Sequence, residues 1–223
     1  MARKQGSTES GKLGDKILYT WHGRQCERAM PTHVANPQTE AQQTHRSNFA
    51  LISKLSSYMK DAHLVGLHWL SVREHNSTYA LFRKLNKDCF TPEGDINYPR
   101  IIVSKGSVQE ASITSAKVEN GVLTVTFDNR HDGGDPTGEF YLFVYCPALC
   151  TGRLATPVPR SAGLVTAVLP DEWLHANPTT DTQDLHLYAF HRGSKGRTSN
   201  TIYYPVGLTL SNAAATFILP FQK

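Results

Sequence analysis

The sequence predicts an α+β protein: an N-terminal strand plus a short helical segment, followed by an antiparallel Ig-like or fibronectin-III-like β-sandwich. Apolar residues recur at three- and four-residue steps between residues 40 and 85, which is the helical period. From about Tyr98 onward, short β-rich runs separated by turn signals replace that period. The net charge also differs between the two parts of the chain, because the positive excess lies in the first quarter. Residues 1–60 hold nine Lys or Arg and four Asp or Glu, whereas residues 100–223 hold ten of each.

Residues 1–14 are rich in Gly, Ser and Lys, and we expect a flexible basic arm there. Residues 15–97 should form a strand plus a three-helix N-terminal region. The strand is predicted over Lys16–Gln25, where Ile17, Tyr19 and Trp21 alternate with polar residues.

The first helix is predicted over Glu40–Lys60. Pro37 disfavours a helical conformation at Asn36, so the helix should begin after this pair. Thr39-x-x-Gln42 forms a capping box at the start of the helix. A second helix should cover about Ala62–Val72. A third should start after the cap Asn76-Ser77, before a turn cluster closes the helical part.

Residues 98–206 are predicted to form the sandwich, because seven short β-rich runs occur in about a hundred residues. In Val122–Phe127 the residues alternate between two faces, as in a strand with one buried face. The runs are Ile101–Val103, Ile113–Val118, Val122–Phe127, Phe140–Tyr145, Leu164–Leu169, Leu185–Phe190 and Thr201–Val206.

Residues 207–223 form an apolar C-terminal tail. A monomer that exposed Phe217, Ile218, Leu219 and Phe221 would carry an apolar surface that soluble proteins usually avoid. We therefore expect 207–223, and also 1–20, to contact another copy or another protein of the same assembly. The alternative is that the tail is a last core strand.

Basic and aromatic residues near the N-terminus are the strongest candidates for a binding surface. Clustered Lys and Arg suit a phosphate backbone or an acidic protein, and aromatic residues could stack on bases. A packing role for the aromatic residues favours protein contact. With the tail, the predicted interaction residues are Lys12, Lys16, Trp21, Arg24, Arg28, Arg46, Phe217, Ile218, Leu219 and Phe221.

The sequence shows no catalytic pattern. His63 and His68 are five residues apart, which is not one helix face, and no His-Glu-x-x-His, P-loop or dinucleotide fingerprint is present. Cys146 and Cys150 are half of a possible metal site without a second half. Without a signal peptide, the four cysteines, at 26, 89, 146 and 150, are expected to be free thiols. We predict no enzymatic activity, no metal and no cofactor.

The N-terminus lacks the apolar segment of a secretory signal, and no run approaches the roughly 17–25 residues of a membrane span. The sequence therefore predicts a protein made in the cytoplasm, without a membrane span.

The N-terminal part of the chain contains Gly-Lys-x-Gly, Trp-x-Gly and Asn-Pro-x-Thr-x-x-Gln segments. In these segments it resembles an uncharacterised family, a domain of unknown function, abundant in gut-type Bacteroidota and their mobile elements, including prophages. That family usually carries a basic residue where this chain has His22. The matching positions are Gly11, Lys12, Gly14, Trp21, Gly23, Arg28, Pro31, Asn36, Pro37, Thr39, Gln42, Arg46 and Phe49, with Arg160–Gly163, Leu169, Pro170, Trp173, Ser199 and Asn200 further along.

Together these features predict a non-enzymatic structural protein of a phage or prophage virion, or of a similar multi-subunit assembly. Its partners would be other copies of itself and other virion proteins, and the virion would carry it outside the cell. The alternative is a nucleic-acid-binding accessory protein that uses the basic N-terminal quarter.

Overall fold

The computed structural model describes residues 3–5, 8–21, 23–32, 38–90, 94–128, 137–174 and 182–209. The chain divides into two compact parts, Met1–Gln43 and Thr44–Lys223. Each part is described by itself below.

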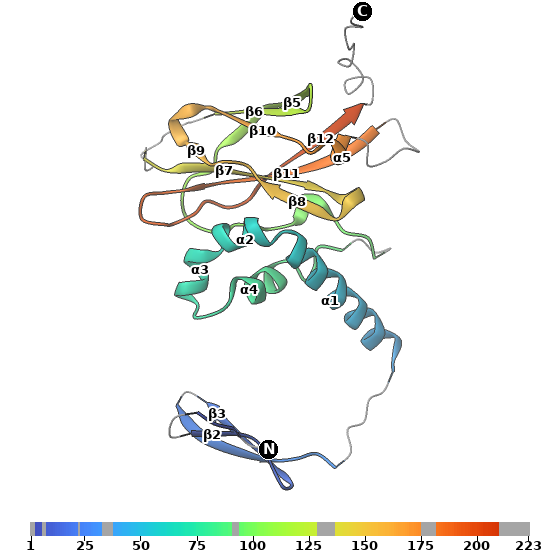
Figure 1. Ribbon diagram of the computed structural model, residues 1–223, viewed down its shortest axis with the longest axis vertical. Coiled ribbons are helices and arrows are strands. Elements are labelled where there is room, and N and C mark those ends of the chain that lie inside the picture. The colour runs from blue at the N-terminus through green and yellow to red at the C-terminus, as the bar shows by residue number, and fades with distance from the viewer. Residues whose placement is uncertain are drawn as a thin grey trace, which may run out of the picture. The chain divides into compact units, whose positions relative to one another are not determined.

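The first part is a four-stranded antiparallel sheet in sequence order. Its strands are β1 (Arg3–Gln5), β2 (Thr8–Leu13), β3 (Lys16–Trp21) and β4 (Arg24–Ala29), seen in blue in Figure 1. The predicted flexible arm over 1–14 is therefore wrong, because its described residues form β1 and β2. The predicted strand over Lys16–Gln25 is two strands, because Gly23 takes a φ of +77° that favours glycine and turns the chain.

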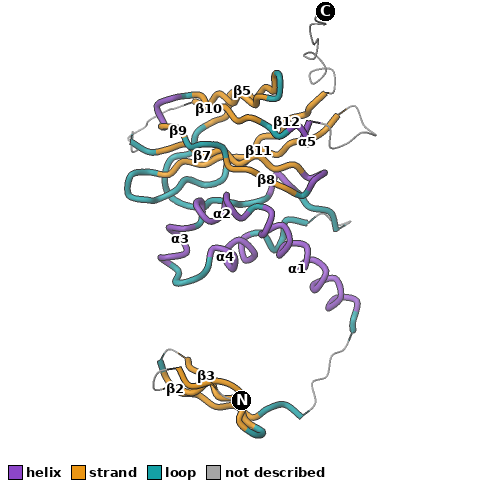
Figure 2. The backbone as a smooth tube through the Cα atoms, viewed as in Figure 1, coloured by secondary structure: helices purple, strands orange, loops and turns teal. Residues whose placement is uncertain are grey.

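Four helices follow the sheet along the chain, where three were predicted, and the division at Gln43 falls within the first turn of the first of them. They are α1 (Glu40–Tyr58), α2 (Lys60–Gly66), α3 (His68–Arg73) and α4 (Thr78–Leu85), drawn in purple in Figure 2. The predicted second helix is divided at Leu67, which lies between α2 and α3.

Both predicted helix starts are confirmed by their caps. The Thr39 hydroxyl accepts a hydrogen bond from the Gln42 N–H at 3.4 Å, and the Ser77 hydroxyl accepts one from the Ala80 N–H at 3.1 Å. The predicted turn at Asn36-Pro37 lies outside the described residues.

A two-sheet antiparallel sandwich follows, and the α+β class is confirmed. One sheet has the order β10-β6-β5, and the other has the order β12-β11-β7-β8, with β9 also pairing with β7. The strands are β5 (Ser112–Glu119), β6 (Val122–Asp128), β7 (Glu139–Cys146), β8 (Thr151–Leu154), β9 (Val158–Pro159), β10 (Leu164–Val168), β11 (Thr182–Arg192) and β12 (Ile202–Thr209).

Short helical turns accompany these strands. η1 (Tyr98–Arg100) precedes β5, and η2 (Pro147–Leu149), η3 (Arg160–Ala162) and α5 (Asp171–Leu174) lie between later strands.

One predicted strand, Ile101–Val103, is a buried loop instead. Side chains satisfy its backbone: the Ile102 N–H donates to Asn86 Oδ1 at 2.6 Å, and the Val103 N–H donates to Thr201 Oγ1 at 2.9 Å. A buried backbone needs such partners, and here they replace a β-ladder. The short strands β8 and β9 were not predicted.

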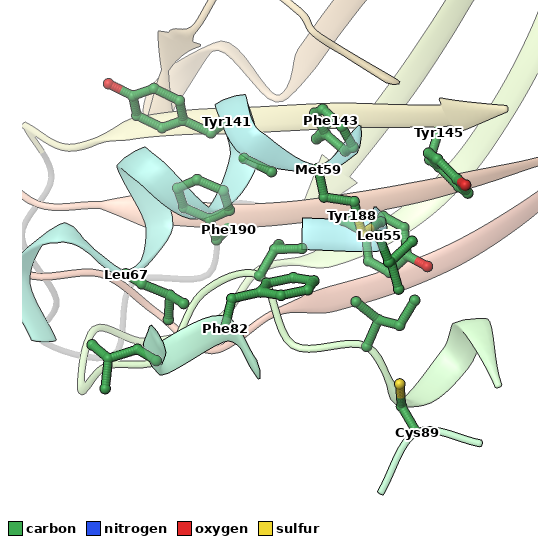
Figure 3. Close-up of a cluster of buried hydrophobic side chains, with 14 of the residues drawn as sticks. Leu55, Met59, Leu67, Phe82, Cys89, Tyr141, Phe143, Tyr145, Tyr188 and Phe190 are labelled. Carbon is green, nitrogen blue, oxygen red and sulfur yellow. The ribbon is translucent and has the colours of Figure 1, made fainter. Parts of the chain in front are cut away.

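The five-stranded sheet is covered on both faces. Toward β6 and β10 it packs a core that includes Phe140, Leu142, Leu185 and Leu187. Figure 1 shows the helices on its other face, and Figure 3 shows the side chains of that second core. The labelled residues are Leu55, Met59, Leu67, Phe82 and Cys89 from the helical region and Tyr141, Phe143, Tyr145, Tyr188 and Phe190 from β7 and β11.

This double coverage corrects the predicted boundary at residue 98. Residues 140–146 of β7 are all buried, which is expected of a strand between two layers rather than on an outer surface. The helices therefore share a core with the sandwich, and the division of the chain lies between Gln43 and Thr44.

The predicted tail begins inside the sandwich. Strand β12 continues to Thr209 and pairs with β11, with Gly207 opposite Asp184 and Thr209 opposite Thr182. Residues 207–209 are thus part of a last strand, which was the alternative for the tail. Phe217, Ile218, Leu219 and Phe221 lie outside the described residues.

Candidate interaction surfaces

The N-terminal sheet gathers four of the predicted residues on one face. Lys12 lies opposite Ile17, Ile17 lies opposite Arg28, and Trp21 lies opposite Arg24. Side chains alternate along a strand, and residues directly opposite share a face. The face, called the basic-aromatic face below, comprises Lys12, Ile17, Tyr19, Trp21, Arg24, Cys26 and Arg28.

Lys16 lies on the other face of this sheet. There its ammonium group forms an ion pair with Glu27 at 2.9 Å, and both side chains are half-exposed. Such a pair contributes little to stability, but it neutralises the lysine locally. Lys16 therefore does not belong with the other four predicted residues.

The basic-aromatic face is open to solvent. Trp21 is 63% exposed and Tyr19 is 39% exposed, and no residue from Ser10 to Ser47 whose burial is described is buried. A small sheet without a buried face is marginally stable by itself, so a covering partner would add stability. Aromatic rings among guanidinium and ammonium groups are suited to an anionic or aromatic-rich partner.

Arg46 belongs to a different surface, on α1. A groove of about 440 Å³ lies between α1 and α4. Its lining includes His45, the residue that precedes Arg46 in the sequence. Phe49 is 53% exposed on this groove, and the Arg83 guanidinium lies 5.5 Å from its ring centroid. The lining residues are His45, Asn48, Phe49, Ile52, Ala80, Arg83, Lys84 and Lys87.

Sequence reasoning missed a group of cations at the end of α4. Arg83 and Lys84 lie in its last turn, and Lys87 lies in the turn that follows the helix. Two of these charges have acidic neighbours, since Lys84 lies 3.4 Å from Glu74 and Lys87 lies 3.9 Å from Asp88.

A second groove, of about 300 Å³, opens between the edge strands β8 and β10. Its lining includes the buried side chains of Val144, Leu169 and Trp173. Arg153 and Thr166 lie at its polar parts, one from each edge strand. The groove can accommodate apolar side chains next to an open strand edge.

Two buried histidines lie in separate places, His63 on α2 and His186 on β11. His63 Nε2 donates to the Ser56 carbonyl at 2.9 Å, and burial lowers the His63 pKa below its usual value. His186 Nδ1 shares a hydrogen bond of 2.8 Å with the Tyr203 hydroxyl, and burial lowers the His186 pKa as well.

Within the described ranges, no group of three or more His, Cys, Asp or Glu residues could hold a metal ion. Cys26, Cys89, Cys146 and Cys150 are free thiols, as expected. Among the helices that the structure describes, none has both the length and the apolar character needed to cross a membrane.

Comparison with known proteins identifies a family but no activity. A family model described as "Family of unknown function (DUF6266)" matches residues 8–175. No curated protein matches the sequence.

Two solved structures are similar to part of the chain. The Clostridium perfringens spore cortex lytic enzyme SleM is 14% identical with a TM-score of 0.32, and the match covers 46% of this chain and 28% of that one. Domains d3–d4 of the rat CD45 extracellular region are 12% identical with a TM-score of 0.31, over 47% of this chain and 52% of that one. Neither likeness bears on what this chain does.

Proposed function

We propose that this chain, which belongs to the DUF6266 family of unknown function, is a non-enzymatic structural protein that joins a multi-subunit assembly through its N-terminal sheet. The observation that carries the proposal is the basic-aromatic face. It presents Trp21, Arg24 and Arg28 to solvent on strands that have no buried residue among those described. Exposed aromatic and Arg side chains are typical anchors of protein interfaces.

The assembly we propose is a phage or prophage virion, or a related structure, from gut-type Bacteroidota. The sequence resemblance supports this origin, because Gly11, Lys12, Gly14, Trp21 and Gly23 match the signature of that group. The partners would be other copies of this chain and other virion proteins. The chain would be made in the cytoplasm and released with the virion, where the sandwich would act as a spacer domain by analogy with similar folds.

A second candidate is nucleic-acid binding by the same face. The specific observation is that Tyr19 and Trp21 lie among the cationic residues Lys12, Arg24 and Arg28. Single-stranded nucleic acid is bound by such combinations of stacking platforms and positive charge.

The test measures the molar mass of the full chain in solution by size-exclusion chromatography with light scattering. We expect a mass above that of a monomer, and we expect the double variant Trp21→Ala/Arg24→Ala to lower it. Lys16→Ala is the matched control, because it removes a cation from the opposite face of the same sheet. A monomeric wild-type chain, or an equal effect of Lys16→Ala, would refute the proposal.

A gel-shift titration with a single-stranded oligonucleotide separates the two candidates. A nucleic-acid-binding protein should lose affinity steeply as salt rises, and Trp21→Ala/Arg24→Ala should remove that binding. Retarded oligonucleotide together with a monomeric mass would favour the second candidate over the first.

A further inference from the structure

We infer that the free edge of β10 is a strand-addition site, and that the added strand is segment 213–221 of a second copy. This rests on the proposed function, since it requires copies to associate. Strand addition uses backbone hydrogen bonds for affinity and side-chain pockets for specificity. Both elements are present at β10.

Open sheet edges in natural proteins usually carry a feature that prevents pairing with another chain. Among the described residues the sandwich has five outer strands: β5 and β10 in one sheet, and β12, β8 and β9 in the other. Strand β9 has only two residues, of which Pro159 is one. Strand β5 carries Lys117 and an irregular register, β12 carries Pro205, and β8 is short and carries Arg153.

Strand β10 is also short, at five residues, but it has none of the other features. Its sequence, Leu164–Val168, contains no charged residue and no proline, and its five pairs with β6 are regular. Along the described chain, β6 is the one strand with which it pairs.

The groove between β8 and β10 supplies the side-chain pocket. It lies beside Thr166, Ala167 and Val168, and its apolar lining includes Trp173 and Leu169, which are 2% and 4% exposed. An extended strand pairing with β10 would direct alternate side chains toward this groove. On the outer face, Val168 is 72% exposed, so an apolar neighbour on the added strand would cover it.

The segment Ala213–Phe221 has the chemistry that this site needs. It contains no charged residue, and Thr216, Phe217 and Ile218 are residues that favour strands. Pro220 stands near its end, which leaves the preceding residues free to donate backbone hydrogen bonds.

Distance favours a second copy over the same chain. Four residue steps from Thr209 to Ala213 span at most about 14 Å. Strand β12 is three positions from β8 in its sheet, and β10 lies in the other sheet. At about 4.8 Å per strand and about 10 Å between sheets, that separation exceeds the reach of the linker.

The experiment uses a labelled peptide of residues 210–223 and the full chain carrying Ile218→Asp, a change intended to keep the chain's own segment out of the groove. We expect the peptide to bind this chain, as measured by fluorescence anisotropy. Adding Thr166→Lys/Val168→Lys should weaken binding by about tenfold or more, because both positions are exposed and lysine protects edges. Ser112→Lys, exposed on the opposite edge strand β5, is the control and should leave binding unchanged.

Failure of the peptide to bind, or equal binding to the lysine variant, would overturn the inference. Light scattering on the same samples keeps the two proposals distinct. A wild-type assembly that depends on Trp21 while the peptide does not bind would refute only the β10 site. Peptide binding to β10 in a wild-type chain that remains monomeric would refute the self-association on which the inference rests.

Discussion

At the scale of single residues, close backbone approaches and buried polar groups determine where substitutions are tolerated. Gly66 is an example at the end of α2. Its carbonyl accepts hydrogen bonds from the Ser104 and Thr198 hydroxyls, both at 3.1 Å. These bonds join the helical region to two segments that are far away in sequence.

We expect Gly66→Ala to lower the free energy of unfolding by about 1–3 kcal/mol. An added Cβ would overlap the Val103 carbonyl oxygen, which is backbone and cannot rotate away. Chemical denaturation would measure the loss. Ser47→Ala, at an exposed position of α1, is the control and should change little. Equal stability of the two variants would contradict this packing.

His63 should make stability depend on pH. It is fully buried, its Nδ1 has no hydrogen-bond partner, and burial lowers its pKa. Above the unfolded-state pKa of about 6.5 both states are neutral, so this group has no effect. Below that value the unfolded chain gains a proton first, and the free energy of unfolding falls until the folded-state pKa is reached.

Replacing this histidine should therefore reduce the acid sensitivity. We expect His63→Gln to lose less stability than wild type between about pH 7.5 and about pH 5.5. Urea denaturation at the two pH values measures the difference. An unchanged difference, or a His63 ring that titrates above 6.5 by NMR, would contradict the expectation.

At the scale of elements, α1 is one helix with two environments. Its C-terminal half buries Ile52 and Leu55, whereas residues 40–47 are all exposed. The first half is thus held mainly by its own hydrogen bonds and by the Thr39 cap. A helix end of this kind frays locally before the protein unfolds.

Thr39→Ala should cost the start of α1 about 0.5–2 kcal/mol. Because that half buries nothing, we expect the cost to appear as faster amide exchange at Gln42 and its neighbours rather than as a large change in global stability. Ser77→Ala provides the comparison, since its cap starts α4, which buries Leu81 and Phe82. Unchanged exchange in Thr39→Ala would show that the cap contributes nothing.

At the scale of the whole molecule, the five-stranded sheet depends on layers from two separate stretches of sequence. Its helix-facing side exposes Tyr141, Phe143, Tyr145, Tyr188 and Phe190 when the helices are absent. Burial of large side chains of this kind contributes about 1.5–3 kcal/mol each. The helical region is therefore part of the folding unit.

A chain that begins at Tyr98 should aggregate or bind hydrophobic dyes, because its aromatic face lacks a cover. A chain of residues 38–223 should give a cooperative unfolding transition, because it keeps the helical layer. Circular dichroism and dye fluorescence compare the two. A well-folded, monomeric product from Tyr98 onward would restore the boundary predicted from the sequence.

Local patterns in the sequence determined the α+β class, the start of α1 and six of the seven predicted sandwich strands. Each depends on nearby residues: a cap at Thr39, alternation in Val122–Phe127, and turn signals between runs. The sequence predicted only part of the basic-aromatic face. It shows that Lys12, Trp21, Arg24 and Arg28 are near one another along the chain, but not the turn at Gly23 that sets the strand register.

Tertiary structure decided the rest. Ile101–Val103 has the composition of a strand, yet the side chains of Asn86 and Thr201 satisfy its backbone from distant positions. The unprotected edge of β10 exists only because strand order places β6 on one side and an open groove on the other. The spacing of apolar residues in the sequence indicates which side chains will be buried. Packing between segments that are distant in the sequence determines which residues cover them.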